Sequence, residues 1–360
     1  MEIPKLRIGD LTAEIPIVQG GMGVRISLAS LASAVAEEGG IGTISSIGLG
    51  DFEAARQEYE RISREALQAE IRKARAMTRG ILAVNFMGAL SNVEDLVQTA
   101  VREGIQMIVF GAGLPMKLPE LVQDRSVNLV PIVSSARAGE LILRGWAKRY
   151  ERTADALILE GPLAGGHLGF SLEQLGHPQD YALETLLPQT LEAVKPYEDR
   201  FGRKIPLIAA GGIFDGRDIA RMLLLGAAGV QMATRFVCTK ECDASQEFKQ
   251  SYLDAREEDI VIIKSPVGLP GRAIRNKFLE DLEKVDRLKI NCPYHCLTAC
   301  KVAEARFCIA QALLNAYRGD VDHGLLFCGQ NAPRINRIVT VKELIAELLS
   351  ELRTALKDVS

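Results

Sequence analysis

Short apolar runs rich in valine and isoleucine alternate along the chain with longer segments whose apolar residues recur at helical spacing. The runs lie at residues 15–19, 41–45, 81–86, 107–110, 128–133, 154–159, 205–209 and 230–233. The helical segments lie at residues 27–38, 52–77, 93–103, 118–122, 136–149, 183–194 and 215–225. Buried parallel strands appear as continuous apolar runs, with helices as crossovers. Eight such units within the first 236 residues predict an α/β fold, a (β/α)8 TIM barrel, because an open doubly wound sheet usually has fewer strands.

The alternation stops after Phe236, and the chain becomes charged and cysteine-bearing. We interpret residues 237–325 as a smaller, mostly helical lid domain inserted into the barrel. An apolar stripe at helical spacing returns at residues 341–356 and predicts the eighth barrel helix. The barrel domain is therefore expected to comprise residues 1–236 and 326–360.

Glycines follow several of the predicted strands, as expected of a barrel whose ligand lies over the carboxyl ends of its strands. Gly211 and Gly212 end the seventh strand, and the eighth ends near Thr234. In barrels, the loops after strands seven and eight often form a phosphate site from backbone N–H groups and a helix N-terminus. A simple turn would explain the Gly211-Gly212 pair taken alone. The two adjacent strand ends together predict a cofactor that carries phosphate.

The segment AGGHLG, residues 164–169, places His167 among three glycines directly after the sixth strand. Such a loop exposes backbone N–H groups and gives little side-chain cover, which suits an anion or a flavin edge. It also leaves an imidazole free to move protons. The alternative interpretation is a tight turn with an incidental histidine.

Two other strand ends offer contacts for a flat ring. Residues 19–23, QGGMG, follow the first strand and could pack against an isoalloxazine face. Asn85 closes the third strand and could hydrogen-bond a ring carbonyl or N–H through its amide. The alternative role for Asn85 is that of a turn residue at a strand end.

Four of the seven cysteines fall within 17 residues: Cys292, Cys296, Cys300 and Cys308. On a helix, the first three would share one face because they are four residues apart. Four thiolates close together could hold zinc or an iron–sulfur cluster. The alternative is an apolar core stripe, since free cysteine packs as a small hydrophobe.

The composition of the chain limits the kinds of partner that we expect it to bind. The net charge of −3 gives no electrostatic footprint for nucleic acid. The chain contains no apolar run of 18 residues, and its first residues lack the apolar core of a secretory signal. We therefore expect neither a membrane span nor secretion, with the cytoplasm as the default location. The oligomeric state stays open, with a homodimer as one option.

Five segments, PIVQGGMG, AVNFM, EGPLAGGHLG, IPLIAAGGI and GAAGVQMATRF, occur in an order and at spacings that resemble the nitronate monooxygenase family. This family, also called 2-nitropropane dioxygenase-like, includes the FMN-dependent enoyl-ACP reductases of type II. The resemblance covers about residues 12–236, and the GLPGRAIRNKF stretch also resembles the family. It implies an FMN-binding barrel with a smaller lid, and NAD(P)H as an electron donor.

The resemblance also implies site residues. The FMN contacts would be Gly21, Met22, Gly23, Asn85, Glu160, Gly165, Gly166, Gly211, Gly212, Gln231, Met232 and Thr234. His167 matches the histidine beside the flavin and would act as acid or base. Many nitronate monooxygenases resemble QGxEAGGH, whereas this chain has EGPLAGGH. Leu163 thus replaces an acidic residue, and Glu160 resembles the reductase branch more closely.

Two reactions compete. In one, NAD(P)H reduces FMN, which passes hydride to an activated double bond, such as that of an enoyl thioester, or to a quinone. In the other, FMN takes an electron from an alkyl nitronate and oxygen completes a monooxygenation. Glu160 favours the reductase, while a non-enzymatic flavin binder is a third hypothesis.

Overall fold

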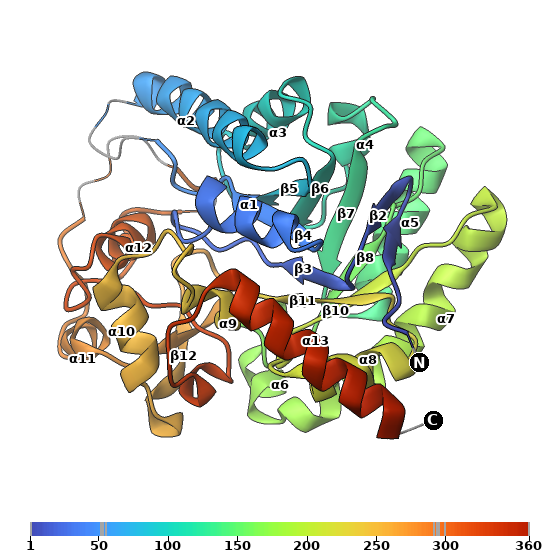
Figure 1. Ribbon diagram of the computed structural model, residues 1–360. Helices are drawn as coiled ribbons and strands as arrows, with labels where there is room; N and C mark the ends of the chain where they lie inside the picture. The colour runs from blue at the N-terminus through green and yellow to red at the C-terminus, as the bar shows by residue number, and fades with distance from the viewer. Residues whose placement is uncertain are drawn as a thin grey trace.

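The computed structural model describes residues 2–50, 54, 56–290, 292, 296–298 and 300–358, and its centre is a closed barrel of parallel strands (Figure 1). Around the barrel the strands are β3 (Ile17–Gln19), β4 (Ile41–Ser45), β5 (Ile81–Met87), β6 (Met107–Gly111), β7 (Asn128–Val133), β8 (Leu157–Glu160), β10 (Leu207–Ala210) and β11 (Gly229–Met232). The ring closes where β11 pairs with β3. Each predicted apolar run supplies one barrel strand, so the TIM-barrel prediction is confirmed.

Helices cover the outside of the barrel between successive strands. They are α1 (Ala29–Glu37), α2 (Arg56–Met77), α3 (Val93–Arg102), α4 (Leu118–Leu121), α5 (Ala136–Tyr150), α7 (Leu183–Phe201), α8 (Gly216–Leu224) and α13 (Val341–Asp358). The predicted start of the second helix, at residue 52, lies outside the described residues. α7 contains two internal prolines but continues past its predicted end at residue 194. It packs against α5.

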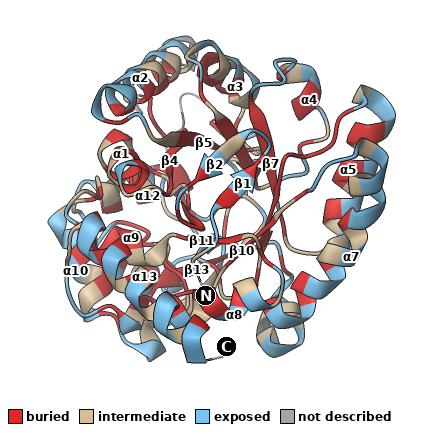
Figure 2. Cartoon of the chain, turned by 45° about the vertical axis from the view of Figure 1, so that its right-hand side comes forward, coloured by how far each residue is buried: buried red, intermediate tan, exposed pale blue. Residues whose placement is uncertain are grey.

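Two apolar cores hold the barrel together. One fills its interior, where Val18, Val109 and Ile208 are fully buried. A hairpin of β1 (Leu6–Ile8) and β2 (Leu11–Ala13), which the sequence did not predict, contributes Leu6 and Ile8 to this core. The other core lies between strands and helices, so the helices turn buried faces inward and exposed faces outward (Figure 2).

The last helix returns to the barrel as predicted. α13 packs against α8 and also contacts α1. Gly216, the first residue of α8, lies so close to α13 that an added Cβ would come within 2.3 Å of the Leu352 backbone nitrogen. None of the described helices is both long and apolar enough to cross a bilayer.

The segment between β11 and α13 is less helical than predicted. It contains α9 (Thr234–Val237), α10 (Gln246–Asp254), α11 (Lys277–Glu283) and α12 (Ile309–Tyr317). It also contains an antiparallel hairpin of β12 (Ile260–Lys264) and β13 (Pro270–Ile274). β13 pairs in turn with β9 (Gly166–His167), so this segment is joined directly to the loop that carries His167. Its status as a separate lid domain stays a prediction.

Shorter elements complete the described chain. They are α6 (Leu172–Gly176) and the 3-10 turns η1 (Pro178–Tyr181), η2 (Glu257–Asp259) and η3 (Ala332–Arg334).

Candidate active site

A cavity of about 280 Å³ opens at the carboxyl ends of the barrel strands, where active sites of this fold lie. Its walls come from the ends of β3, β5, β8, β10 and β11, and from the segment between β11 and α13. Every residue that the sequence assigned to FMN or to catalysis lines this one cavity. Their chemical roles stay predictions.

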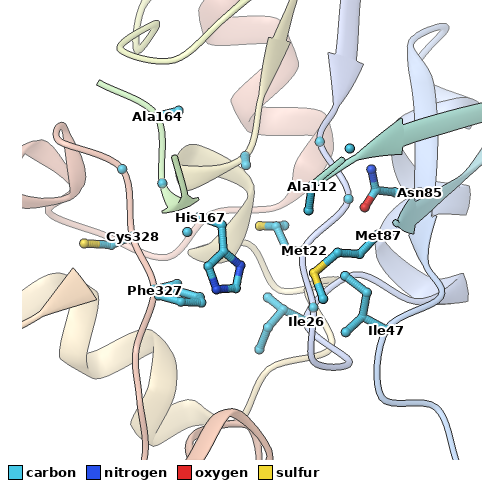
Figure 3. A pocket seen from close by; sticks show the side chains of 18 of the residues that line it. Met22, Ile26, Ile47, Asn85, Met87, Ala112, Ala164, His167, Phe327 and Cys328 are labelled. Carbon is cyan, nitrogen blue, oxygen red and sulfur yellow. The ribbon is translucent and has the colours of Figure 1, made fainter. Parts of the chain in front are cut away.

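His167 projects into the cavity from β9 (Figure 3). Its Nε2 atom lies 2.8 Å from Ser265 Oγ, and no other hydrogen bond of the ring forms among the described residues. The Phe327 ring packs edge-on against the imidazole, with centroids 5.0 Å apart. Burial lowers the pKa of His167 to about 4, so the ring is neutral at neutral pH.

Ser265 is a site residue that the sequence did not reveal. It follows β12 and is 4% exposed. Its Oγ accepts a hydrogen bond from the Val267 N–H at 3.2 Å, which favours donation of the hydroxyl proton to His167 Nε2. That arrangement places the ring proton of His167 on Nδ1. Ser265 lies 98 residues from His167 in the sequence, so no periodic pattern along the chain could have linked the two residues.

Glycines form a tight cradle beside His167. Gly211 and Gly212 have φ values of +91° and +84°, in the left-handed region that side chains disfavour. A Cβ on Gly211 would lie 2.9 Å from the Gly161 carbonyl oxygen. A Cβ on Gly165 would lie 2.6 Å from the Cys328 carbonyl carbon. Close packing between the loops and the left-handed backbone thus exclude side chains at these positions, so no side chain of these glycines covers the backbone N–H groups that a phosphate site requires.

Two amide side chains line the cavity with free hydrogen-bonding capacity. Gln231 Oε1 is buried and has no hydrogen-bond partner among the described residues. The Asn85 side chain likewise forms no hydrogen bond within the described part of the chain, and Gly21 packs against its Cβ. Figure 3 shows Asn85 across the cavity from Phe327 and Cys328. Buried polar atoms without partners indicate that a polar ligand completes the site.

Glu160 ends β8 beside the cradle. Burial raises its pKa to about 8, although Arg272 partly opposes this shift. Glu160 is therefore protonated at neutral pH and adds no negative charge to the cavity. Arg272 itself is 4% exposed, and its Nη1 donates to the carbonyl oxygens of Pro162, at 2.9 Å, and Ala164. It thus fastens the loop before His167.

The cysteine-rich stretch differs from the helix suggested by its spacing. The described residues 292, 296–298 and 300 are not helical. Leu297 instead forms an antiparallel bridge with Leu90 in the loop after β5, which extends the backbone there. Cys296 lines the cavity, and Cys308 immediately precedes α12. No three His, Cys, Asp or Glu side chains among the described residues are grouped so as to hold a metal ion.

Three comparisons place the chain among known proteins. The family model described as nitronate monooxygenase matches residues 5–351. The (3aS,4S,5R,7aS)-5-hydroxy-7a-methyl-1-oxo-octahydro-1H-indene-4-carboxyl-CoA dehydrogenase of Mycobacterium tuberculosis is 32% identical over 276 residues, covering 77% of this chain and 67% of that protein. A probable nitronate monooxygenase of Staphylococcus aureus (strain JH9) is 26% identical over 299 residues, covering 77% and 79%. The structure of FabK from Thermotoga maritima superposes with a TM-score of 0.76 at 28% identity, covering 96% and 95%.

The closed barrel and the cavity at its carboxyl end define a TIM-barrel enzyme with its active site over the strand ends. The family match spans nearly the whole chain, and the relatives are named as redox enzymes. The chain belongs to the nitronate monooxygenase family and is an oxidoreductase.

Proposed function

We propose that this protein is an FMN-dependent oxidoreductase that uses NAD(P)H and acts on the activated double bond of an enoyl thioester. The observation that carries the proposal is a neutral, buried His167 beside a glycine cradle, in a cavity whose lining contains no lysine or arginine among the described residues. The dehydrogenase relative, named for a CoA substrate, also supports a thioester.

The residues present fit FMN. The phosphate would lie against the backbone of Gly211 and Gly212 near the Thr234 hydroxyl, where a protonated Glu160 does not repel it. Gln231 and Asn85 would supply hydrogen bonds to the polar edge of the cofactor, since their amide groups have unused capacity. When bound, FMN supplies hydride transfer, and the protein supplies orientation and screening from water.

His167 would act on the substrate through its free ring nitrogen. Ser265 holds Nε2 and fixes the ring, so Nδ1 is available to the thioester. The Nδ1–H group can donate a hydrogen bond to the thioester carbonyl oxygen, on which negative charge develops when the double bond is reduced. The proton that is added at the carbon next to the carbonyl would come from water that this ring orients.

The cavity walls favour an apolar substrate body. Leu90, Leu297, Ile309 and Leu313 also line the cavity. No lysine or arginine is among the described residues that line it. A carboxylate or phosphate of the substrate would find no cation there, so the charged part of a CoA or carrier thioester would stay outside.

Oxidation of an alkyl nitronate is the second candidate, favoured by the family match and by the Staphylococcus aureus relative. His167 would then accept a proton from a neutral nitroalkane or hydrogen-bond the nitronate anion. A non-enzymatic flavin binder loses its support, because the chain belongs to a family of enzymes. A homodimer and a cytoplasmic location stay predictions from the sequence.

Anaerobic half-reactions of the FMN-loaded protein test the proposal. We expect NADH or NADPH to bleach the flavin spectrum, and an enoyl thioester to restore it. His167→Gln, which keeps a hydrogen-bonding side chain of similar length, should bind FMN normally but slow reoxidation by the thioester at least tenfold.

Other outcomes separate the candidates. If a nitronate reduces the flavin and neither NADH nor NADPH does, the protein is a nitronate monooxygenase and not a reductase. Unchanged reoxidation in His167→Gln would remove this residue from the mechanism.

A further inference from the structure

A second cavity, of about 240 Å³, lies among α9, α13 and the chain that joins η3 to α13. Its lining shares no described residue with the active-site cavity. The lining includes three arginines, Arg235, Arg334 and Arg337, and Glu347 is the one carboxylate among its described residues. This arginine cavity therefore carries two more positive than negative charges on its wall.

The Phe214 ring holds two of the three guanidinium groups close together. Arg235 Cζ lies 4.5 Å from the ring centroid, and Arg334 Cζ lies 4.0 Å from it. The two guanidinium carbons are therefore no farther apart than the sum of these distances. Like charges at such a separation repel each other, so an anion that contacts both groups would be stabilised by both.

Glu347 brings the third guanidinium group to the same place. Its Oε1 accepts a hydrogen bond from Arg235 Nη2 at 2.8 Å, and its Oε2 accepts one from Arg337 Nη2 at 2.8 Å. The Arg235 side chain is only 12% exposed, and its Nη1 also donates to the Phe214 carbonyl at 3.2 Å. One carboxylate thus fixes two arginines and neutralises only one of them.

Arg334 is positioned from behind by two carboxylates that do not line the cavity. It lies 3.0 Å from Asp215 and 3.8 Å from Asp218. Asp215 is shared with Arg217 at 3.4 Å, and Asp218 is shared with Arg221 at 2.9 Å. These carboxylates hold Arg334 in place, and each of them already faces a second arginine.

The guanidinium groups keep most of their hydrogen-bond donors. An arginine side chain has five N–H donors. Within the described part of the chain, the Arg337 side chain donates only to Glu347, and Arg235 Nε has no acceptor. The planar fork of an arginine matches the oxygens of a phosphate group, and such charge-assisted hydrogen bonds are strong.

We propose that the arginine cavity binds a phosphate group. A phosphate monoester carries roughly two negative charges at neutral pH, which equals the excess positive charge of the lining. The cavity is smaller than the roughly 300–1,000 Å³ pockets that enclose drug-sized ligands. The ligand is therefore inorganic phosphate, diphosphate or the phosphate end of a larger metabolite.

This site is distinct from the glycine cradle to which we assign the FMN phosphate. Phe214 follows Gly212 by two residues and Arg235 directly follows Thr234, yet the arginines line the second cavity alone. The two sites should therefore be occupied together. The proposal goes beyond the proposed function and does not depend on it.

Isothermal titration calorimetry of the full chain with phosphate, at a constant ionic strength set by sodium chloride, tests the site. We expect saturable binding of one phosphate per chain, which persists when the protein is saturated with FMN. Pyrophosphate and glycerol 3-phosphate are titrated in parallel. Tighter binding of pyrophosphate would support a free diphosphate as the ligand, and tighter binding of glycerol 3-phosphate would support a phosphorylated metabolite.

Arg337→Gln removes one guanidinium group whose side chain bonds only Glu347 within the described chain, and it should weaken phosphate binding at least tenfold. Arg334→Gln/Arg337→Gln should abolish it. The matched control is Arg72→Gln on α2, because Arg72 is 64% exposed and paired with Glu103, much as Arg337 is 66% exposed and paired with Glu347. This control should bind phosphate like the wild type.

Three results would overturn the site: no saturable binding of any of the three probes, equal affinity in the wild type and Arg337→Gln, and loss of phosphate binding when FMN is added. The last result would mean that the phosphate occupies the glycine cradle. Thermal melting of each variant shows that it is folded, and Arg337→Gln decides the question if the double variant is not. A chain that binds phosphate through these arginines but takes up no FMN would defeat the proposed function alone.

Discussion

Removal of the Ser265 hydroxyl tests how His167 is held. Ser265→Ala deletes the 2.8 Å contact to Nε2 and leaves that nitrogen buried without a partner. The net value of such a hydrogen bond is about 1 kcal/mol, and an unsatisfied buried polar group costs about 1–3 kcal/mol. Since about 1.4 kcal/mol corresponds to a tenfold change in rate, the reaction of the substrate should slow by roughly 5- to 150-fold.

The assay is anaerobic stopped-flow reoxidation of the reduced, FMN-loaded protein by an enoyl thioester. Ser265→Thr keeps a hydroxyl and should recover most of the rate. Ser251→Ala is the control, because it removes an exposed hydroxyl of α10 that donates to the Glu247 carbonyl. Reduction by NAD(P)H should be nearly unchanged in all three variants.

Two results would refute this reasoning. An unchanged reoxidation rate in Ser265→Ala would show that the hydrogen bond does not position the ring. A loss of FMN from Ser265→Ala, with no recovery in Ser265→Thr, would assign Ser265 a purely structural role in the turn after β12.

Two further predictions concern FMN binding. The pKa of Glu160 is about 8, so this carboxyl ionises as the pH rises through 8 and then repels a phosphate. The FMN dissociation constant of the wild type should therefore rise above pH 8, while that of Glu160→Gln should stay flat in a fluorescence titration; parallel curves would contradict this role. Gly165→Ala places a Cβ 2.6 Å from the Cys328 backbone and should weaken FMN binding at least tenfold, whereas Gly176→Ala, with no atom within 4 Å, should bind normally. Equal affinity in these two variants would argue against the cradle.

The sequence predicted the barrel because its signal is local. Each strand is a continuous apolar run, and the strand ends bring the glycines and His167 to one rim regardless of the details of the loops. The hairpin of β1 and β2 was missed because two strands of three residues are too short to show periodicity. The hairpin of β12 and β13 was missed although the run IVII and the glycines after it are signals of a strand and a turn.

Contacts between distant segments could not be predicted. Ser265 meets His167, and Arg272 meets the Ala164 carbonyl, only because β13 pairs with β9. The spacing of Cys292, Cys296 and Cys300 suggested a helix, but the backbone at Leu297 pairs with the loop after β5 instead. Here a tertiary hydrogen-bonding partner overrides a local pattern.

Titration of the purified protein with FMN, followed in the same anaerobic cuvette by NADH or NADPH, tests the central claim most directly. The account predicts binding of one FMN per chain, bleaching of the flavin by a nicotinamide, and slower reoxidation by an enoyl thioester in His167→Gln than in the wild type. A protein that binds no FMN, or whose bound FMN reacts equally in both forms, would contradict it.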